Sequence, residues 1–221
     1  MSTVPAGFIQ PSTVWGVYNN LLFVIEQALS KVQTASLVQV QACSNDGADS
    51  PVGTVDVVIL VNQQNGQGNP TPHVTMYEMP YLRVQGGANA VIMDPQPGDI
   101  GIAVFASRDI TKVKSTKAQA NPGSFRMHDF SDGLYMGGVL NGQPSQYVQF
   151  TSAGVTIVSP TAITLQAPNI VLNGALQQAG GIATIAETLA VTGDVTASGV
   201  SVKTHIHSGV TTGSGDTGVP V

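Results

Sequence analysis

The sequence predicts a mainly β protein in which a small barrel is followed by a stalk that several identical chains build together. Residues 34–105 hold alternating apolar segments between turn residues, and residues 155–202 hold short β-forming segments that recur about every seven to eight residues. Only 10% of the residues are charged, less than a monomer of this size normally needs to cover its surface. This shortage indicates a surface rich in Ser, Thr, Asn and Gln, or a large surface hidden by self-association.

The first predicted element is a helix, in an N-terminal helical segment that covers residues 1–33. Ser12 or Thr13 is a suitable cap for it. Its apolar residues recur at helical spacing: Leu21, Leu22, Ile25, Leu29 and Val32. Two roles remain open for this helix, packing on its own domain or docking onto neighbouring subunits.

Five strands are predicted after the helix, over residues 38–42, 55–61, 74–84, 90–92 and 100–105. Turn residues separate them, among them Asn45-Asp46-Gly47 and Pro95-Gln96-Pro97-Gly98. Five short strands in this order favour a small closed antiparallel barrel, for which the oligonucleotide/oligosaccharide-binding (OB) fold is the common form at this size.

Nucleic-acid binding is disfavoured, although OB barrels often bind single strands. The net charge is -5, whereas a nucleic-acid binder carries a basic face. The basic residues of this region fit a solvated face or a subunit contact better; they are Arg83, Arg108, Lys112, Lys114, Lys117 and Arg126.

A dense polar group lies in residues 121–149, which we expect to form a joint. His128 beside Asp129 and Asp132 is compatible with general acid/base chemistry, but an ion-paired anchor at the join between two domains is the favoured interpretation. No nucleophile motif, phosphate loop, dinucleotide-binding glycine signature or zinc-protease motif accompanies it. We therefore expect no enzyme and no small-molecule substrate.

The sequence also bears on where the chain is assembled. The single cysteine, Cys43, excludes an intrachain disulfide. No signal peptide is visible, and the apolar run at residues 21–25 is too short to span a membrane. These features predict assembly in a cytosol.

The last part of the chain predicts the stalk. Residues 133–202 contain no Lys or Arg, and their repeat is shorter than the roughly 20 residues per coil of a single-chain solenoid. Three chains wound about one axis suit the spacing better, because symmetry gives every strand edge a partner.

Taken together, these motifs resemble the central spike proteins of contractile-tailed bacteriophage baseplates (baseplate assembly protein V and relatives). The resemblance rests on the barrel, the segments 97–101 and 105–110, Arg126-Met127-His128 with Ser131-Asp132, the β-repeat stalk, and Thr204-His205-Ile206-His207 before a Gly-rich tail. It implies an N-terminal OB-fold barrel (34–120) with an N-terminal helix, then the joint, a C-terminal triple-stranded β-helix stalk formed by a homotrimer (150–204) and a metal-binding tip (205–221).

The resemblance also implies a function. In this family the spike is a structural part of the virion tail baseplate and attaches to tail hub or tube proteins through its N-terminal domain. When the tail contracts, the spike pierces the host outer membrane and its tip enters the periplasm. His205 and His207 of three chains would hold one octahedral iron ion, and further axial ions are compatible with this site. The alternative is a trimeric tail fibre or tailspike that binds a receptor or processes polysaccharide.

Strand geometry supports the histidine pair and also raises a difficulty. Side chains two apart in a strand point the same way, so two imidazoles from each of three chains offer six nitrogen donors, a set that favours iron, nickel or cobalt over zinc. However, Val200 and Val202 share their parity with Ile206 and not with the histidines. A kink near Lys203-Thr204 is therefore needed to turn the histidines inward.

Overall fold

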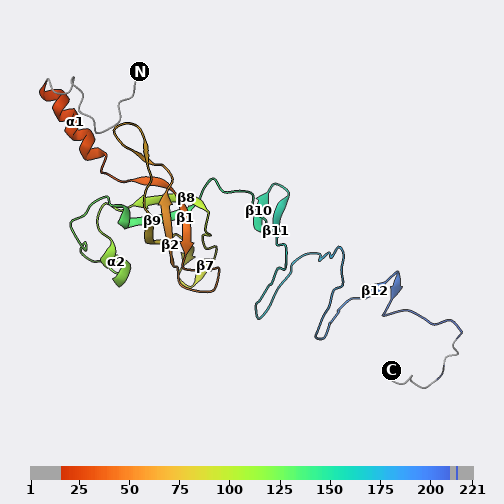
Figure 1. Ribbon diagram of the computed structural model, residues 1–221. Coiled ribbons are helices and arrows are strands. Elements are labelled where there is room, and N and C mark those ends of the chain that lie inside the picture. Colours follow the sequence, from red (N-terminus) through yellow and green to blue (C-terminus); the bar gives the residue numbers. More distant parts are fainter. Residues whose placement is uncertain (1–15, 210–212, 214–221) are drawn as a thin grey trace. The chain divides into compact units, whose positions relative to one another are not determined.

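The computed structural model describes residues 16–209 and 213 (Figure 1). The chain forms two compact units, which divide between Pro160 and Thr161. Unit 1 is mainly β, with one N-terminal helix, α1 (Val17–Leu29). The predicted helix is confirmed; Gly16 occupies its N-cap position, and the predicted caps Ser12 and Thr13 lie outside the described residues. None of the helices in the described ranges has the length and apolar character needed to cross a membrane.

A curled five-stranded antiparallel sheet forms the centre of unit 1. Its strands lie in the order β5-β2-β1-β8-β9, and they are β1 (Ala35–Cys43), β2 (Thr54–Ile59), β5 (Met76–Pro80), β8 (Ile100–Phe105) and β9 (Gly133–Gly138). Register shifts interrupt three of the pairings, and such irregularities bend a sheet. The two ends of the sheet meet at a bridge between Tyr81 and Tyr135, where Leu82 N donates to Tyr135 O over 2.7 Å. This architecture is consistent with an OB-like fold.

Alternation along the strands builds the core of this sheet. In β2, Val55, Val57 and Ile59 are buried, while the residues between them are partly exposed. The other buried apolar residues are Val38, Val40, Met79, Tyr81, Ala103, Phe105 and Tyr135. The sheet thus buries one face, as its period of two predicts.

The strand prediction is wrong at one place. Residues 90–92 were expected to be a barrel strand, but β7 (Asn89–Val91) pairs only with β6 (Val84–Gly86) in a separate small hairpin. The fifth strand of the sheet is β9, from the segment expected to form a joint. Its sequence Gly-Leu-Tyr-Met-Gly-Gly has few β-branched residues, so pairing with β8 rather than local propensity makes it a strand. A further short hairpin joins β3 (Gln63–Gln64) to β4 (Pro70–Thr71).

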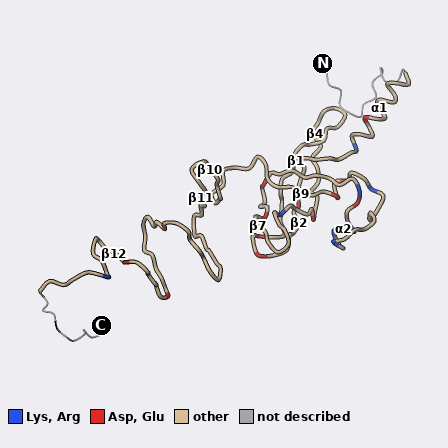
Figure 2. Tube along the Cα trace, turned by 180° about the vertical axis from the view of Figure 1, so that it is seen from behind, with Lys and Arg blue, Asp and Glu red and all other residues tan. Residues whose placement is uncertain are grey.

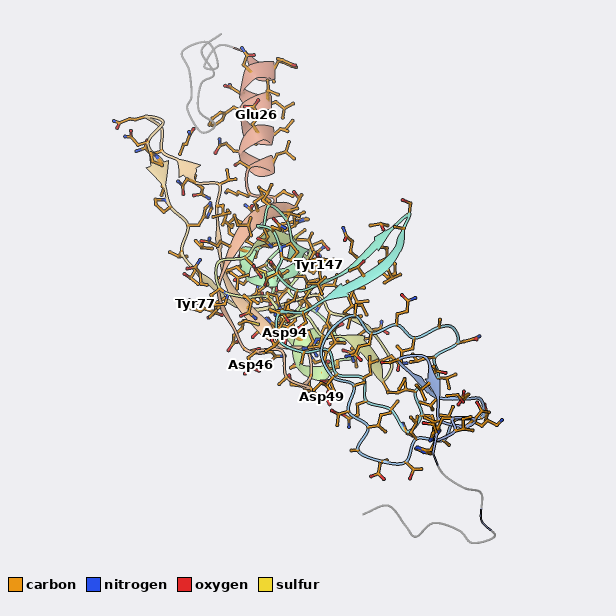
Figure 3. The ribbon with its side chains drawn as sticks, turned by 90° about the vertical axis from the view of Figure 1, so that its right-hand side faces the viewer. Glu26, Asp46, Asp49, Tyr77, Asp94 and Tyr147 are labelled. Atoms are coloured by element: carbon orange, nitrogen blue, oxygen red, sulfur yellow. The ribbon has the colours of Figure 1, made fainter. Side chains whose placement is uncertain are left out.

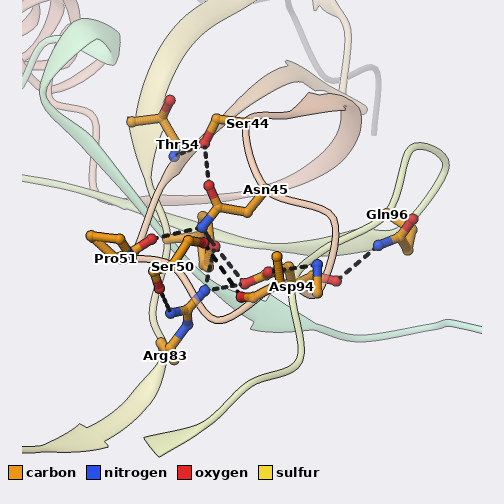
Figure 4. A network of polar contacts seen from close by, with 11 residues as sticks. Ser44, Asn45, Ser50, Pro51, Thr54, Arg83, Asp94 and Gln96 are labelled. Atoms are coloured by element: carbon orange, nitrogen blue, oxygen red, sulfur yellow. Dashed lines mark hydrogen bonds and ion pairs between the residues drawn. The ribbon is translucent and has the colours of Figure 1, made fainter. Parts of the chain in front are cut away.

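A buried polar network holds the loops at one end of the sheet (Figure 4). Arg83 Nη2 lies 2.6 Å from Asp94 Oδ1, and both side chains are almost fully buried. Tyr81 donates its hydroxyl to the same carboxylate, and Asn45 Nδ2 donates to the Tyr81 oxygen over 3.0 Å. Arg83 was expected on a solvated face or a subunit contact, and this is wrong, because its guanidinium is committed to an internal ion pair.

Among the residues that the structure describes, the remaining helical elements lie beyond β8. They are α2 (Thr111–Thr116) and a single 3-10 turn, η2 (Phe130–Asp132). After β9, β10 (Tyr147–Thr151) and β11 (Gly154–Val158) form a hairpin whose strands pair from Tyr147 opposite Val158 to Thr151 opposite Gly154.

Unit 2 has very little regular structure in its described residues. Its strands there are β12 (Thr196–Ala197) and β13 (Val200–Ser201). Every described residue from 161 onward is exposed except Ser201, which is partly buried. Figure 2 shows that charged residues are also sparse along this part of the chain. The described part of unit 2 therefore has no core of its own in a single copy.

Candidate functional site

The two histidines predicted as metal ligands follow a short hairpin in unit 2. Strands β12 and β13 pair with Thr196 opposite Ser201 and Ala197 opposite Val200. The loop residues between them, Ser198 and Gly199, have φ values of 48° and 84°. Two successive positive φ values are typical of the two-residue turns that match the twist of a hairpin, so this turn fixes where the last strand ends.

Directly after β13 the chain leaves the extended conformation. The backbone oxygen of Ser201 accepts a hydrogen bond from His205 N over 3.1 Å. The hydroxyl of Ser201 accepts from Thr204 N over 2.9 Å and lies 2.8 Å from Thr204 Oγ1. Residues 201–205 thus form one hydrogen-bonded turn. This turn confirms the kink that the sequence required near Lys203-Thr204.

Asp194, two residues before β12, is hydrogen-bonded to the turn. Its Oδ1 accepts a hydrogen bond from Lys203 N over 3.1 Å, and Val202 N donates to Val195 O over 2.8 Å. A hydrogen bond from the Ser201 side chain, followed by the one from Lys203 N, lowers the pKa of Asp194 below its usual value. The carboxylate is therefore stabilised in its charged form where it binds the turn.

The turn also orients the first histidine. His205 Nδ1 lies 3.1 Å from Ser201 O and 3.1 Å from Val202 O. Carbonyl oxygens only accept hydrogen bonds, so Nδ1 carries the proton of the neutral ring and Nε2 keeps its lone pair. A backbone partner on one ring nitrogen is the arrangement commonly found behind metal-binding histidines. Nε2 of His205 is thus the ring nitrogen left without a backbone partner.

The second histidine lies beside the first. The ring centroids of His205 and His207 are 5.1 Å apart, with an angle of 76° between the planes, and both residues are exposed. Within the described residues, no group of three or more His, Cys, Asp or Glu side chains gathers in a way that could hold a metal ion. Among the described residues, one chain therefore brings two imidazoles together without a third such side chain beside them.

The other two histidines of the chain belong to unit 1. His73 packs edge-on against the ring of Phe130, with centroids 5.5 Å apart. His128 has a φ of 50° and sits in the loop that precedes η2.

The polar group around His128 forms an ion-paired anchor, but this anchor lies inside unit 1 and not at the join between two domains that the sequence favoured. Arg126 binds the fully buried Asp132 through Nε at 2.6 Å and Nη2 at 2.8 Å, and its Nη2 lies 3.0 Å from Asp109 Oδ1. Hydrogen bonds from Thr111, and then from Ser124, lower the pKa of Asp109 to about 2. Asp132 also accepts from Ile110 N over 3.0 Å. These contacts tie the segment after β8 to the segment before β9.

Sequence reasoning missed two residues of the histidine turn, Asp194 and Ser201. The available signal was the Ser198-Gly199 pair, because Ser-Gly between β-forming residues marks a tight turn. A hairpin centred there places Asp194 close to the residues that follow Val202.

Comparison with known proteins bears on the same segment. Residues 199–221 match the family model described as the GpV Apex motif. The matched residues begin at the hairpin turn and include the histidine turn. No curated protein matches the chain. The chain thus carries, in its C-terminal segment, the apex motif of the phage baseplate central spike (gpV-like) proteins.

Proposed function

We propose that this chain is a structural central spike of a phage baseplate. Three copies form its stalk, one iron ion is held by His205 and His207 of each copy, and the assembled spike pierces the host outer membrane when the tail contracts. The observation that carries this proposal is the apex-motif match over the segment that contains both histidines. In gpV-like proteins this motif is the iron-binding tip.

The exposure of unit 2 supports assembly from several chains. Ordering one residue costs about 1–2 kcal/mol in conformational entropy, and burial of apolar side chains normally offsets this cost. In a single copy Ile182 is 91% exposed and Ile206 is 92% exposed. Further apolar residues are more than half exposed, among them Ile163, Leu165, Ile170, Leu172, Leu176, Ile185 and Leu189. Winding three such chains together gives these side chains a shared core.

The residues of the turn fit an iron ion. Two imidazoles per chain supply six nitrogen donors in a homotrimer, an octahedral set that suits iron, nickel or cobalt better than zinc. Among these metals, the apex motif favours iron. The backbone contacts of His205 Nδ1 leave its Nε2 as the donor atom. When bound, the metal would cross-link the three chains at the narrow end, where few side chains are available for packing.

The rest of the proposed mechanism depends on stiffness. The barrel of unit 1 attaches the spike to hub or tube proteins of the tail, in the virion. The proposed segments are a helical segment (1–33), a barrel whose sheet includes β9, a stalk (150–204) and a tip (205–221). A stalk whose strand edges are all paired with other chains resists bending, and this transmits the force of contraction to the tip.

The acidic side chains of the proposed stalk do not favour a polysaccharide-processing tailspike. Glycoside hydrolysis uses a pair of carboxylates, and the acids of residues 150–202 are Glu187 and Asp194. Asp194 is engaged by the backbone of Lys203. A structural role agrees with the family of the apex motif.

Sedimentation equilibrium of the full chain tests the proposed assembly. We expect a molar mass of about three times the 22.7 kDa of one chain. A monomer at micromolar concentration would contradict the spike function, because the exposed apolar residues of unit 2 would then have no partner.

A further inference from the structure

The helix α1 presents an apolar stripe that the proposed spike does not yet use. Tyr18, Leu22, Ile25 and Leu29 are separated by four, three and four residues. This is the spacing of the first and fourth positions, a and d, of a seven-residue coiled-coil repeat. In this register Leu22 and Leu29 occupy a positions, and Tyr18 and Ile25 occupy d positions.

This stripe is uncovered in a single chain. No residue of α1 is buried, and Leu22 and Ile25 are 42% and 45% exposed. Figure 3 shows the side chains of the helix, including that of Glu26, projecting away from it on several sides. An isolated helix of 13 residues is marginal in water, because most helical stability in proteins comes from packing of an apolar face.

The charge of the helix is compatible with identical copies packed side by side. Glu26 is the only charged residue between Val17 and Leu29. In a parallel bundle it would lie opposite the g-position Leu21 of the next chain, so no two like charges face each other. Leu21 and Ala28, at the g positions, also widen the apolar stripe.

The residue types at the stripe indicate the number of copies. Leucine at a with isoleucine at d shifts parallel coiled coils from two strands toward three or four. We propose that the α1 helices of three chains pack in parallel around the axis of the spike, so that each stripe is covered by two further copies of this chain. This inference rests on the proposed trimeric spike and extends it to the N-terminal helix.

The attachment of α1 to the sheet is short enough to align the three helices. Five residues separate Leu29 from the first residue of β1, and the last of them, Thr34, accepts a hydrogen bond at its oxygen from Phe105 N over 2.9 Å. The helix is therefore joined closely to β1 and β8, and symmetry of the three barrels would place the three helices equivalently around one axis.

Disulfide cross-linking in the full chain tests this packing. The parent carries Cys43→Ser, which removes the native thiol. Ile25→Cys places a thiol on the stripe, and Val24→Cys is the matched control, because it is the neighbouring residue, is 60% exposed and lies off the stripe. Each variant is oxidised mildly, run on a denaturing gel without reductant, and checked for oligomeric state by sedimentation.

We expect about two thirds of the Ile25→Cys chains to run as linked pairs, because three thiols on one axis close one disulfide and leave one chain free. The Val24→Cys control should give only background linking. A trimer in which both variants link equally weakly would overturn the proposal and assign the stripe to a partner outside the trimer. A monomer would instead refute the proposed spike itself, so the two failures are distinguishable.

Discussion

Replacement of Asp194 tests how the turn that carries the two histidines is held. Asp194→Ala removes the oxygen that accepts from Lys203 N and also loses the contact with the Ser201 side chain. The turn then keeps its internal hydrogen bonds, from His205 N to Ser201 O and from Thr204 to the Ser201 hydroxyl, and the bond from Val202 N to Val195 O. Because His205 Nδ1 is oriented by two carbonyl groups of this turn, a looser turn orients the imidazole less well.

The expected effect is on metal affinity. Loss of a hydrogen-bonding partner behind a metal ligand lowers affinity by about 10–100-fold. Asp194 acts through the backbone of the turn and not on the imidazole directly, so we expect the lower end of this range, about tenfold. Asp194→Asn keeps a carbonyl oxygen for Lys203 N and should retain most of the affinity.

Iron retention against increasing chelator measures this effect on the purified trimer. Glu187→Ala is the control, because Glu187 is the other acid of residues 150–202. All variants must sediment as the wild type does. If Asp194→Ala held its metal as tightly as the wild type, or if Glu187→Ala lost it equally, the positioning role of Asp194 would be refuted.

The barrel provides three further predictions. Asp132→Ala leaves Arg126 without its bidentate partner and should cost about 2–3 kcal/mol of unfolding free energy. This cost is lower than for a fully buried pair, because the Arg126 side chain is 34% exposed. Urea unfolding followed by tyrosine near-UV circular dichroism measures the loss, and an unchanged unfolding midpoint would contradict it. Gly101→Ala directs a Cβ into the Tyr135 ring and the Gly137 carbonyl and should cost about 1–3 kcal/mol in the same assay, whereas Gly142→Ala, whose Cβ meets no atom within 4 Å, should not. The folded-state pKa of Asp109, about 2, lies below the ordinary value near 3.9. The ionised carboxylate therefore stabilises the fold fully above about pH 4, and this stabilisation is lost as the pH falls toward 2. Asp109→Asn should flatten the dependence of thermal stability on pH in that window, and an unaltered slope would contradict this role of Asp109.

Local alternation was enough to predict most of the sheet. Residues 38–42, 55–61 and 100–105 alternate in hydrophobicity, and β1, β2 and β8 lie there. The sequence could not show that β9, and not residues 90–92, is the fifth strand of the sheet. A three-residue strand and a glycine-rich strand have little alternation in hydrophobicity, and tertiary pairing decides their partners. The burial of Arg83 was hidden for a related reason: its partner Asp94 lies eleven residues away, across the β6–β7 hairpin.

The histidine turn was predicted in part. The alternation of Val200, Val202 and Ile206 required a kink before the histidines, and the turn over residues 201–205 supplies it. The sequence did not reveal that Asp194 and Ser201 hold this turn, because their contacts depend on the hairpin that folds the chain back at Ser198-Gly199. The triple-stranded stalk stays a prediction, since its core would come from contacts between chains.

Metal content measured together with molar mass tests the central claim most directly. The purified full chain should form a trimer that contains about one iron ion per three chains, the stoichiometry of an octahedral site with six imidazoles. The double variant His205→Ala, His207→Ala should contain none. A wild-type trimer without metal, or a double variant that keeps its iron, would contradict the proposed tip.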